Sequence, residues 1–292
     1  MVNELLQGAI EVHVHATPDI GERASDFIAL AREYRQAGFA GVLIKDHFQP
    51  STDRAYALNH LGGDGFRVWG GLVLNRPVGG FNPTAVAVAV ERGARVVFMP
   101  TSAARNHLIR VGRLLPPYDR VRVMDAGDEG MTIFGPGGSL LPEVVDIIDQ
   151  VIAARRVLGT GHLSPDECIA LAETAQARGS CRILVNHASH YISNLSVADQ
   201  RRMVALGALI EHSWVATKHQ HHPIRPEAIA EQIRAVGAEH CILSSDYGQP
   251  RLGSPVAGFR DMVATLLDLG ITPEEIRTMI HTNPRRLLEE VN

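Results

Sequence analysis

Short apolar runs alternate along the chain with longer segments in which apolar residues recur every three or four positions. The runs are typical of strands, and most are apolar at consecutive positions, as expected of parallel strands that are buried on both faces. The segments between them carry helix-start signals, such as Ser164 followed by Pro165 and then by Glu167. The predicted strands are residues 10–15, 39–47, 66–74, 94–99, 156–162, 182–187, 207–212 and 240–246.

Strands that alternate with helices predict a parallel sheet, and eight such units predict closure into a (β/α)8 TIM barrel, an α/β fold. No change in composition marks a linker, so we expect residues 1–292 to form a single domain. An open, doubly wound sheet is the alternative, but it usually has a glycine-rich turn after its first strand, where this chain has His13-Val14-His15. The unusually long segment 102–141 predicts an insertion after the fourth strand, of the kind that forms lids or binding sites.

Charge balance and cysteine usage narrow the partner and the compartment. A formal charge of -4 without a basic block argues against nucleic acid or an anionic membrane and leaves a small molecule as the expected partner. The chain has neither a signal-peptide pattern nor a run near the ~20 apolar residues of a membrane helix, so we expect a cytoplasmic protein. Cys168, Cys181 and Cys241 are isolated, so neither a disulfide framework nor a cysteine zinc site is expected.

Histidine and acidic residues stand at the ends of several predicted strands. In a (β/α)8 barrel these ends and the loops after them form one rim, where active sites are built. Because side chains alternate along a strand, we expect His13 and His15 on one face of the first strand and Val12 and Val14 on the other. The other candidates at this rim are Lys45 and His47 after the second strand, His162 after the fifth, His187 after the sixth, Glu211 or His212 on the seventh and Asp246 on the eighth.

Each candidate alone has a structural explanation. Asp246, for example, is followed by Tyr247-Gly248 and fits a turn. The occurrence of suitable residues at four separate strand ends is harder to explain by chance. Several imidazoles with one carboxylate suit zinc or a similar divalent ion and leave room for a catalytic water. The rim therefore predicts a metal site.

With these residues the sequence resembles the metal-dependent amidohydrolase superfamily over essentially its whole length. Within that superfamily it looks closest to an uncharacterised amidohydrolase-like group, through segments 13–19 (HVHATPD), 161–164 (GHLS), 245–249 (SDYGQ) and the late Asn283-Pro284. The resemblance implies a hydrolase that uses metal-activated water on a C–N or C–O bond of a small molecule, as in an amide, cyclic amide, lactone or ester. The matching strand-end residues are His13, His15, His162, His187 and Asp246.

The resemblance also implies a role for each of these residues. His13, His15 and Asp246 would hold the more buried ion, and His162 and His187 would hold a second ion or contact the substrate. Asp246 would in addition accept the proton of the attacking water. The cofactor implied is zinc or a similar divalent metal.

One departure from the family leaves the number of ions open, as one or two. Two-metal members usually carry a bridging lysine carbamate or glutamate on strand four, where this chain has Phe-Met-Pro-Thr at 98–101. Lys45 has the parity to replace that bridge as a carbamate, or it stays unmodified and neutralises Asp46 or attracts an anionic substrate. Three catalytic roles are open for Glu211, as a ligand, as a base that positions water or as a partner of Lys45.

Two alternatives to hydrolysis remain. Glu11-x-His13-x-His15 also resembles the single-metal decarboxylase branch of the superfamily, in which the acidic residue joins the coordination. Glu11 has the parity for this role, although it fits a buried structural carboxylate equally well. The second alternative is a non-catalytic barrel that binds a metabolite.

Substrate contacts are expected from the end of the second strand, from the long segment after the fourth and from the loop after the seventh. The segment 102–141 would choose the substrate, which the sequence does not name. Barrels of this kind often pair, so we expect a homo-oligomer. The residues predicted to contact substrate are His47, Arg105, His107 and Lys218.

Overall fold

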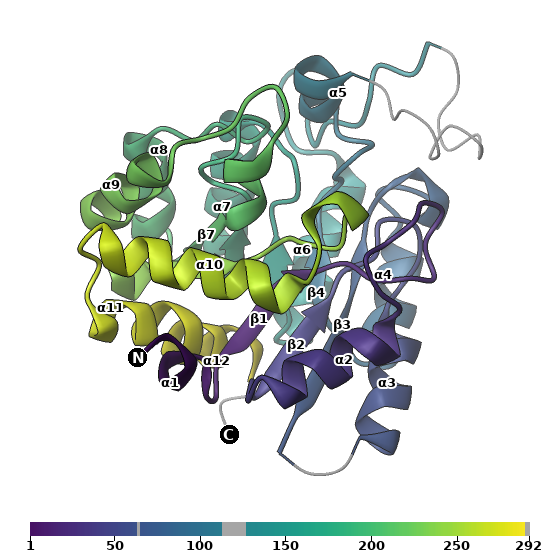
Figure 1. Cartoon of the computed structure of the whole chain (residues 1–292). Coiled ribbons are helices and arrows are strands. Elements are labelled where there is room, and N and C mark those ends of the chain that lie inside the picture. The colour runs from purple at the N-terminus through teal and green to yellow at the C-terminus, as the bar shows by residue number, and fades with distance from the viewer. Residues whose placement is uncertain (63–64, 113–126, 290–292) are drawn as a thin grey trace.

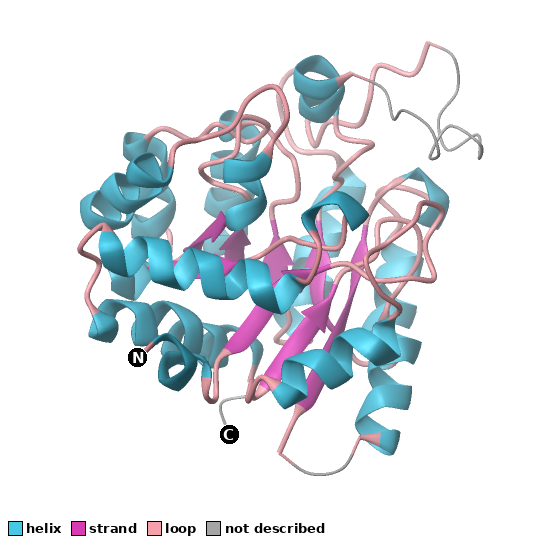
Figure 2. Ribbon diagram, viewed as in Figure 1, coloured by secondary structure: helices cyan, strands magenta, loops and turns pink. Residues whose placement is uncertain are grey.

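The computed structural model describes residues 1–62, 65–112 and 127–289, and its strands form one sheet of eight strands in sequence order. Each strand pairs in parallel with the next along the chain, and helices surround the sheet, as Figure 1 and Figure 2 show. The predicted (β/α)8 barrel is therefore confirmed. The strands are β1 (Ile10–Val14), β2 (Gly41–Ile44), β3 (Arg67–Val73), β4 (Ala94–Phe98), β5 (Val157–Gly159), β6 (Arg182–Val185), β7 (Leu209–Ser213) and β8 (Cys241–Ser244).

The helices begin where the sequence offers caps. Ser164 and Glu167 exchange hydrogen bonds between side chain and backbone at the start of α7, so the capping box expected there is present. Asn82 accepts the Ala85 N–H and caps α4. Among the described residues, none of the helices is both long and apolar enough to cross a membrane. The α-helices described are α1 (Val2–Leu6), α2 (Phe27–Gln36), α3 (Thr52–Leu61), α4 (Pro83–Glu91), α5 (Arg105–Val111), α6 (Pro142–Ala153), α7 (Pro165–Ala177), α8 (Val197–Ala205), α9 (Pro226–Val236), α10 (Pro255–Asp268), α11 (Pro273–Arg277) and α12 (Asn283–Leu288).

The predicted insertion follows β4. It contains α5, which lies beyond the carboxyl ends of the strands in Figure 1. The Arg105 N–H donates to the Met131 carbonyl at 2.7 Å, and the Ile133 N–H donates to the Glu167 carboxylate at 3.1 Å, so residues 131–133 are attached to α5 and to the start of α7. Residues 113–126 lie outside the described part of the insertion.

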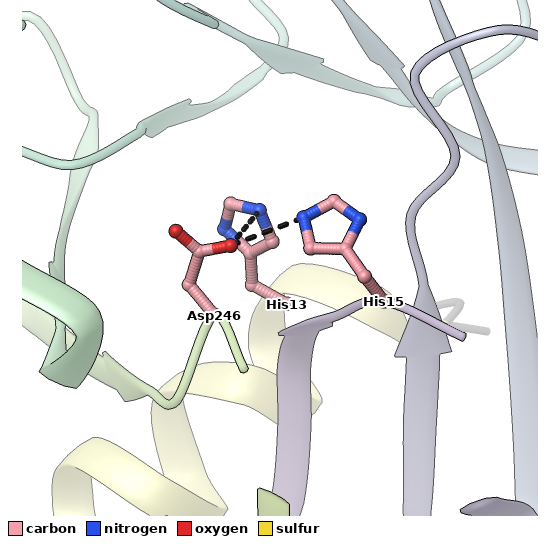
Figure 3. Close-up of side chains that lie close together, drawn as sticks. All are labelled: His13, His15 and Asp246. Atoms are coloured by element: carbon pink, nitrogen blue, oxygen red, sulfur yellow. Dashed lines mark hydrogen bonds and ion pairs between the residues drawn. The ribbon is translucent and has the colours of Figure 1, made fainter. Parts of the chain in front are cut away.

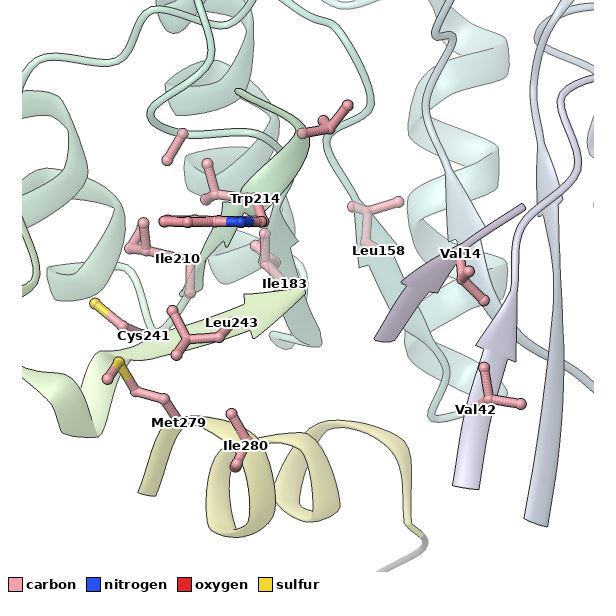
Figure 4. Close-up of a cluster of buried hydrophobic side chains, with 14 of the residues drawn as sticks. Val14, Val42, Leu158, Ile183, Ile210, Trp214, Cys241, Leu243, Met279 and Ile280 are labelled. Atoms are coloured by element: carbon pink, nitrogen blue, oxygen red, sulfur yellow. The ribbon is translucent and has the colours of Figure 1, made fainter. Parts of the chain in front are cut away.

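The core has two layers, which follow from the alternation of side chains along the strands. The outer layer packs between the sheet and the helices, and Figure 4 shows the part of it that includes Trp214, Leu243 and Met279. The inner layer fills the barrel with one alternating set of side chains, such as Leu43, Phe98 and Ile242. Further along the same strands, this inner set is polar, and it forms the candidate site.

The first strand contains an irregularity that the sequence pattern did not predict. The register between β1 and β2 shifts between Glu11 and Val14. Val12 belongs to the inner apolar layer, and the His13 ring also lies inside, 6.4 Å from the ring of Phe98. The expectation that Val12 and His13 point to opposite faces is therefore wrong, because the irregularity breaks the alternation between them. Val14 packs in the outer layer, as expected.

The first and last strands meet at the carboxyl end of the barrel. The Asp246 N–H donates to the His13 carbonyl at 2.9 Å, and the His15 N–H donates to the Tyr247 carbonyl at 2.9 Å. These bonds lie just beyond the end of β8. They hold the residues that follow β8 directly against the end of β1, where the candidate ligands stand.

Candidate functional site

His13, in β1, and His15, directly after it, have defined orientations in the barrel. Nδ1 of His13 lies 2.7 Å from a carboxylate oxygen of Glu211, and Nδ1 of His15 lies 2.8 Å from the Lys45 carbonyl. Because these oxygens only accept, each ring carries a proton on Nδ1, and Nε2 has a lone pair when the ring is neutral. Both Nε2 atoms face Oδ1 of Asp246, at 3.2 Å from His13 and 3.1 Å from His15. Figure 3 shows this convergence.

The three converging atoms fit a divalent cation. Two nitrogen lone pairs and a carboxylate oxygen are all acceptors, and Lys45 Nζ supplies a donor to His13 Nε2 alone, at 3.0 Å. Burial, with some help from Arg23, lowers the pKa of His15 to about 4, so this ring is neutral at pH 7 and able to ligate. Burial raises the pKa of Asp246, but the neighbouring histidines outweigh it and hold the pKa well below the usual value. A nitrogen and carboxylate set of this kind is typical of zinc.

Backbone conformation also aims these side chains. Asp246 and His187, at the ends of two strands, have φ values of 52° and 55°, in the left-handed region that non-glycine residues rarely adopt. Such strain is often found at functional sites. Gly161, with φ of 58°, precedes His162, and a Cβ at Gly161 would lie 2.3 Å from the Met99 carbonyl oxygen. Only glycine therefore fits beside His162.

Glu211 holds His13 in place. One carboxylate oxygen accepts from His13 Nδ1 and, at 2.6 Å, from the Ser244 hydroxyl, while the other accepts from the Asn186 amide at 2.7 Å. Burial raises the pKa of Glu211, but the electrostatic effect of the neighbouring His13 ring and the hydrogen bond from it outweigh burial and keep the pKa below its usual value. This pairing with His13 was not among the three roles considered for Glu211. It is the carboxylate–histidine arrangement that orients metal ligands.

A second group of side chains could also hold an ion. His13, His187 and Glu211 offer ligand atoms within 4.8 Å of one another. His13 Nδ1 and Glu211 are, however, already bonded to each other, so an ion there would have to break that bond. The group of His13, His15 and Asp246 requires no such change, and it is the better candidate.

His187 and His162 stand farther out. His187 Nδ1 lies 3.0 Å from the Ser213 hydroxyl and 3.6 Å from Oδ2 of Asp246, so this ring borders the first group. The His162 ring is 5.1 Å from the His187 ring, and its Nδ1 lies 2.8 Å from Nδ1 of His107. The predicted ligand His162 is therefore near the centre but belongs to neither group of described side chains that could hold an ion.

Lys45 lies inside the barrel, as its parity predicts. Nζ contacts His13 Nε2 and stands 4.9 Å from the centre of the Phe98 ring. Burial lowers the pKa of Lys45 to about 8, although neighbouring carboxylates oppose this effect. The alternative in which Lys45 neutralises Asp46 is wrong, because Asp46 pairs with Arg54 at 2.6 Å.

Glu11 does not join the ligands. Its carboxylate accepts from the Tyr34 hydroxyl of α2 at 3.1 Å, from the Ser245 N–H at 3.0 Å and from the His13 N–H at 3.0 Å. The irregularity in β1 separates Glu11 from the face of His13. Of the two interpretations of Glu11, the structure favours the buried structural carboxylate.

The predicted substrate contacts divide into two pairs. His47 stacks on His15, with ring centroids 4.7 Å apart, and His107 pairs with His162, so both histidines border the centre. Lys218 instead pairs with Asp261 of α10 at 3.1 Å. Arg105 is 46% exposed and lies 3.9 Å from Glu129. No described contact brings Lys218 or Arg105 to the candidate ligands.

Several residues that support the site were not found by sequence reasoning. They are Thr101, Asn186, His190, Ser213 and Ser244, which are all buried near the ends of strands. His190 had a signal, because it follows His187 by three positions in the loop after the sixth predicted strand. The others are small polar residues without a pattern of their own, and only their contacts identify them.

The chain shares its (β/α)8 barrel fold with solved structures of other proteins. It is similar to an amidohydrolase from Pseudomonas aeruginosa, at 13% identity and a TM-score of 0.65 over 98% of each chain. It is similar to a probable 2-pyrone-4,6-dicarboxylic acid hydrolase from Acinetobacter baumannii, at 12% identity and a TM-score of 0.59 over 97% of this chain and 100% of that one. A 2,6-dihydroxybenzoate decarboxylase from Rhizobium is also similar, at 13% identity and a TM-score of 0.55 over 97% and 99% of the two chains.

The sequence itself identifies a narrower family. Residues 8–211 match the family described as "Family of unknown function (DUF6282)", and the chain belongs to this family. The matched region includes the histidines of β1, His162 and His187, whereas Asp246 follows it. No curated protein matches the chain.

Proposed function

We propose that this protein is a metal-dependent hydrolase that acts on a C–N or C–O bond of a small molecule. The observation that carries the proposal is the convergence of the Nε2 atoms of His13 and His15 on Oδ1 of Asp246, in rings whose Nδ1 atoms face Glu211 and the Lys45 carbonyl. Buried acceptors that face one another require a cation between them. We name zinc as the metal because of the nitrogen-rich ligand set.

The chain's own residues suit the hydrolytic task. A divalent ion held at this centre would supply Lewis-acid polarisation of the substrate and acidify a water molecule. Glu211 and the Lys45 carbonyl keep the two imidazoles in the ligating tautomer. Oδ2 of Asp246 faces away from the β1 histidines and lies 3.6 Å from His187 Nδ1, so it is placed to take a proton from water and deliver it to the leaving group.

The buried ammonium of Lys45 has a second use in this proposal. It stands 3.0 Å from His13 Nε2, at the centre of the candidate site. A cation there attracts a carbonyl or carboxylate oxygen of the substrate. We therefore propose a small-molecule substrate rather than a macromolecule, and a homo-oligomeric state that sedimentation would test.

Hydrolysis is preferred to decarboxylation because of Glu11. The decarboxylase alternative relied on Glu11 as an additional ligand, and its carboxylate is bonded to Tyr34 and Ser245 instead. Two of the three similar structures named above are described as hydrolases, which supports the same choice. No specific contact in the site favours a decarboxylase.

Metal analysis of the purified full chain tests the proposal. We expect about one equivalent of zinc per chain, and a marked fall in His13→Ala and in Asp246→Ala. The exposed His60 of α3 offers a matched control, so His60→Ala should keep its metal. Less than about half an equivalent in the unsubstituted protein would refute the enzyme and favour a metabolite-binding barrel. A panel of amides, lactones and esters, assayed before and after chelation, then tests hydrolysis itself.

A further inference from the structure

Two further histidines lie beside the candidate centre. Whereas His13 and His15 carry a proton on Nδ1, the contacts of these two histidines place the proton on Nε2. They are His47, in the loop after β2, and His190, in the loop after β6. The His47 ring stacks on His15 with centroids 4.7 Å apart, and the His190 ring lies 5.9 Å from that of His187. Neither belongs to a group of described side chains that could hold an ion.

The backbone places the proton of His190. The Ile192 N–H donates to His190 Nδ1 at 3.2 Å. A nitrogen that accepts an amide N–H has no proton of its own, so the ring is neutral and its proton lies on Nε2. Nε2 has no hydrogen-bond partner among the described residues, and the His190 residue is 6% exposed. His190 therefore presents an N–H donor to accessible space.

A chain of side chains places the proton of His47. Oδ1 of Asn75 accepts from the backbone N–H of Thr101 at 2.9 Å and from that of Ala103 at 3.2 Å. The amide nitrogen of Asn75 is therefore the atom that donates to the Thr101 hydroxyl oxygen, at 2.8 Å. Thr101 is completely buried, and its hydroxyl lies 2.9 Å from His47 Nδ1. Among the described residues, this nitrogen is the acceptor that the Thr101 hydroxyl can reach. A hydroxyl that did not donate to His47 would be buried without an acceptor, which is unfavourable. His47 therefore also has its proton on Nε2.

The two donors stand on opposite sides of the barrel. β2 and β6 are separated by three strands in either direction around the eight, so the loops after them face each other across the mouth. Burial lowers the pKa of both rings, and the charge of Asp246 opposes this effect in each, which places both rings within electrostatic range of one carboxylate. Nε2 of His47, like that of His190, has no described partner, and the His47 residue is partly exposed.

We propose that His47 and His190 each donate an Nε2–H hydrogen bond to a substrate oxygen, on opposite sides of the bond that is cleaved. This inference rests on the proposed function, because it takes the substrate to be bound at the metal centre. Fixed N–H groups donate to carbonyl and carboxylate oxygens, and they disfavour ammonium groups, which are themselves only donors. The substrate class is thus a small amide, ester or lactone with a further carbonyl or carboxylate oxygen beyond the cleaved bond, and a small dicarboxylate resembles its product. Thr101 and Asn75 are positioning residues that act through His47.

Long-range nitrogen–proton NMR of the histidine-labelled full chain tests the tautomers, with and without added zinc. We expect both His47 and His190 to be protonated on Nε2. Thr101→Val removes the hydroxyl at similar volume, so His47 should gain the Nδ1-protonated form while His190 is unchanged; Thr101→Ser keeps the hydroxyl and should behave as the unsubstituted protein. Protonation of Nδ1 of His47 or His190 in the unsubstituted protein would overturn the proposal, and an unchanged His47 in Thr101→Val would overturn the positioning role of Thr101.

Ligand binding tests the substrate class with malonate, succinate and glutarate as probes and putrescine as the cationic comparison. We expect a dicarboxylate to shift both Nε2–H signals and putrescine to shift neither. His190→Leu should weaken binding of that dicarboxylate about tenfold, the contribution of one hydrogen bond, and His190→Gln, whose amide can donate from a similar position, should weaken it less. His60→Leu is the matched control. A series in which no dicarboxylate moves either signal would overturn the inference.

These measurements separate the two proposals. Absence of bound metal or of hydrolysis would refute the proposed function, and the tautomers could still be Nε2-protonated. Conversely, a zinc-dependent hydrolase whose His47 or His190 carried its proton on Nδ1 would retain the function and lose the donor pair.

Discussion

Replacement of Glu211 by glutamine tests whether the second partner of His13 tunes the metal centre. Glutamine keeps the shape of Glu211 and an oxygen that can accept from His13 Nδ1, but it removes the negative charge. In the structure this charge is buried and accepts three short bonds, including the 2.7 Å bond from His13. When His13 ligates a cation, its Nδ1–H becomes more acidic, so the bond to a charged acceptor gains more than the bond to a neutral one.

The magnitude follows from the type of bond that is lost. A hydrogen bond to a charged group contributes about 1.5–3 kcal/mol and a neutral one about 0.5–1.5 kcal/mol, so the difference is about 1–2 kcal/mol. That difference corresponds to a loss of roughly 5- to 30-fold in zinc affinity. It overlaps the 10- to 100-fold range that is typical when the partner of a metal-bound histidine is removed.

Competition with a chromophoric chelator measures the zinc affinity of Glu211→Gln. Glu167 offers a matched control, since it is also buried and accepts several bonds, but at the start of α7 rather than at the centre. Glu167→Gln should therefore keep the affinity of the unsubstituted protein. An unchanged affinity in Glu211→Gln, in a variant that still melts cooperatively, would show that Glu211 does not act on the metal through His13.

Two further predictions concern other buried groups. Lys45→Met removes a buried ammonium that lies 3.0 Å from His13 Nε2. In the same competition assay, the variant should therefore bind zinc as tightly as the unsubstituted protein or several-fold more tightly. A loss of bound metal would instead identify Lys45 as a ligand, for example as a bridging carbamate. Burial lowers the pKa of His212 from 6.5 to about 4, so the unfolded chain takes up a proton in this range and the folded chain does not. The stability from this group is complete above pH 6.5 and falls by about 3 kcal/mol as the pH decreases to 4. His212→Asn keeps a donor for Ser189 and removes the titrating imidazole. Between neutral pH and pH near 5, the free energy of unfolding measured with urea should therefore fall less in the variant than in the unsubstituted protein. Equal falls would contradict the lowered pKa of His212.

The barrel was predictable because its evidence is spread over the whole chain. Eight apolar runs with helices between them leave few alternatives, and the loss of any one run would not change the fold class. The histidines of β1, His187 and Asp246 were predictable for a related reason. The carboxyl ends of parallel strands share one rim, so their position in the sequence is also their position in space.

The failures have a different physical origin. Glu11 was placed on the face of His13 by strict alternation, and the irregularity in β1 breaks that alternation without any change in the apolar pattern. Lys218 was expected in a loop, but it is the last residue of a short 3-10 helix, Trp214–Lys218, and Asp261 pairs with it across 43 residues of sequence. His190 was missed because it lies beyond the strand end, in a loop that the strand pattern does not describe.

The chemistry of each histidine depends on information that the histidines themselves do not carry. His15 and His47 stack on each other, yet the first presents a lone pair and the second an N–H, because one Nδ1 meets the Lys45 carbonyl and the other meets the Thr101 hydroxyl. A ligand set and a donor set can therefore be made from one residue type in a single cavity. It follows that the presence of a histidine at a strand end does not distinguish a metal ligand from a substrate donor, and that the group bonded to its other nitrogen does.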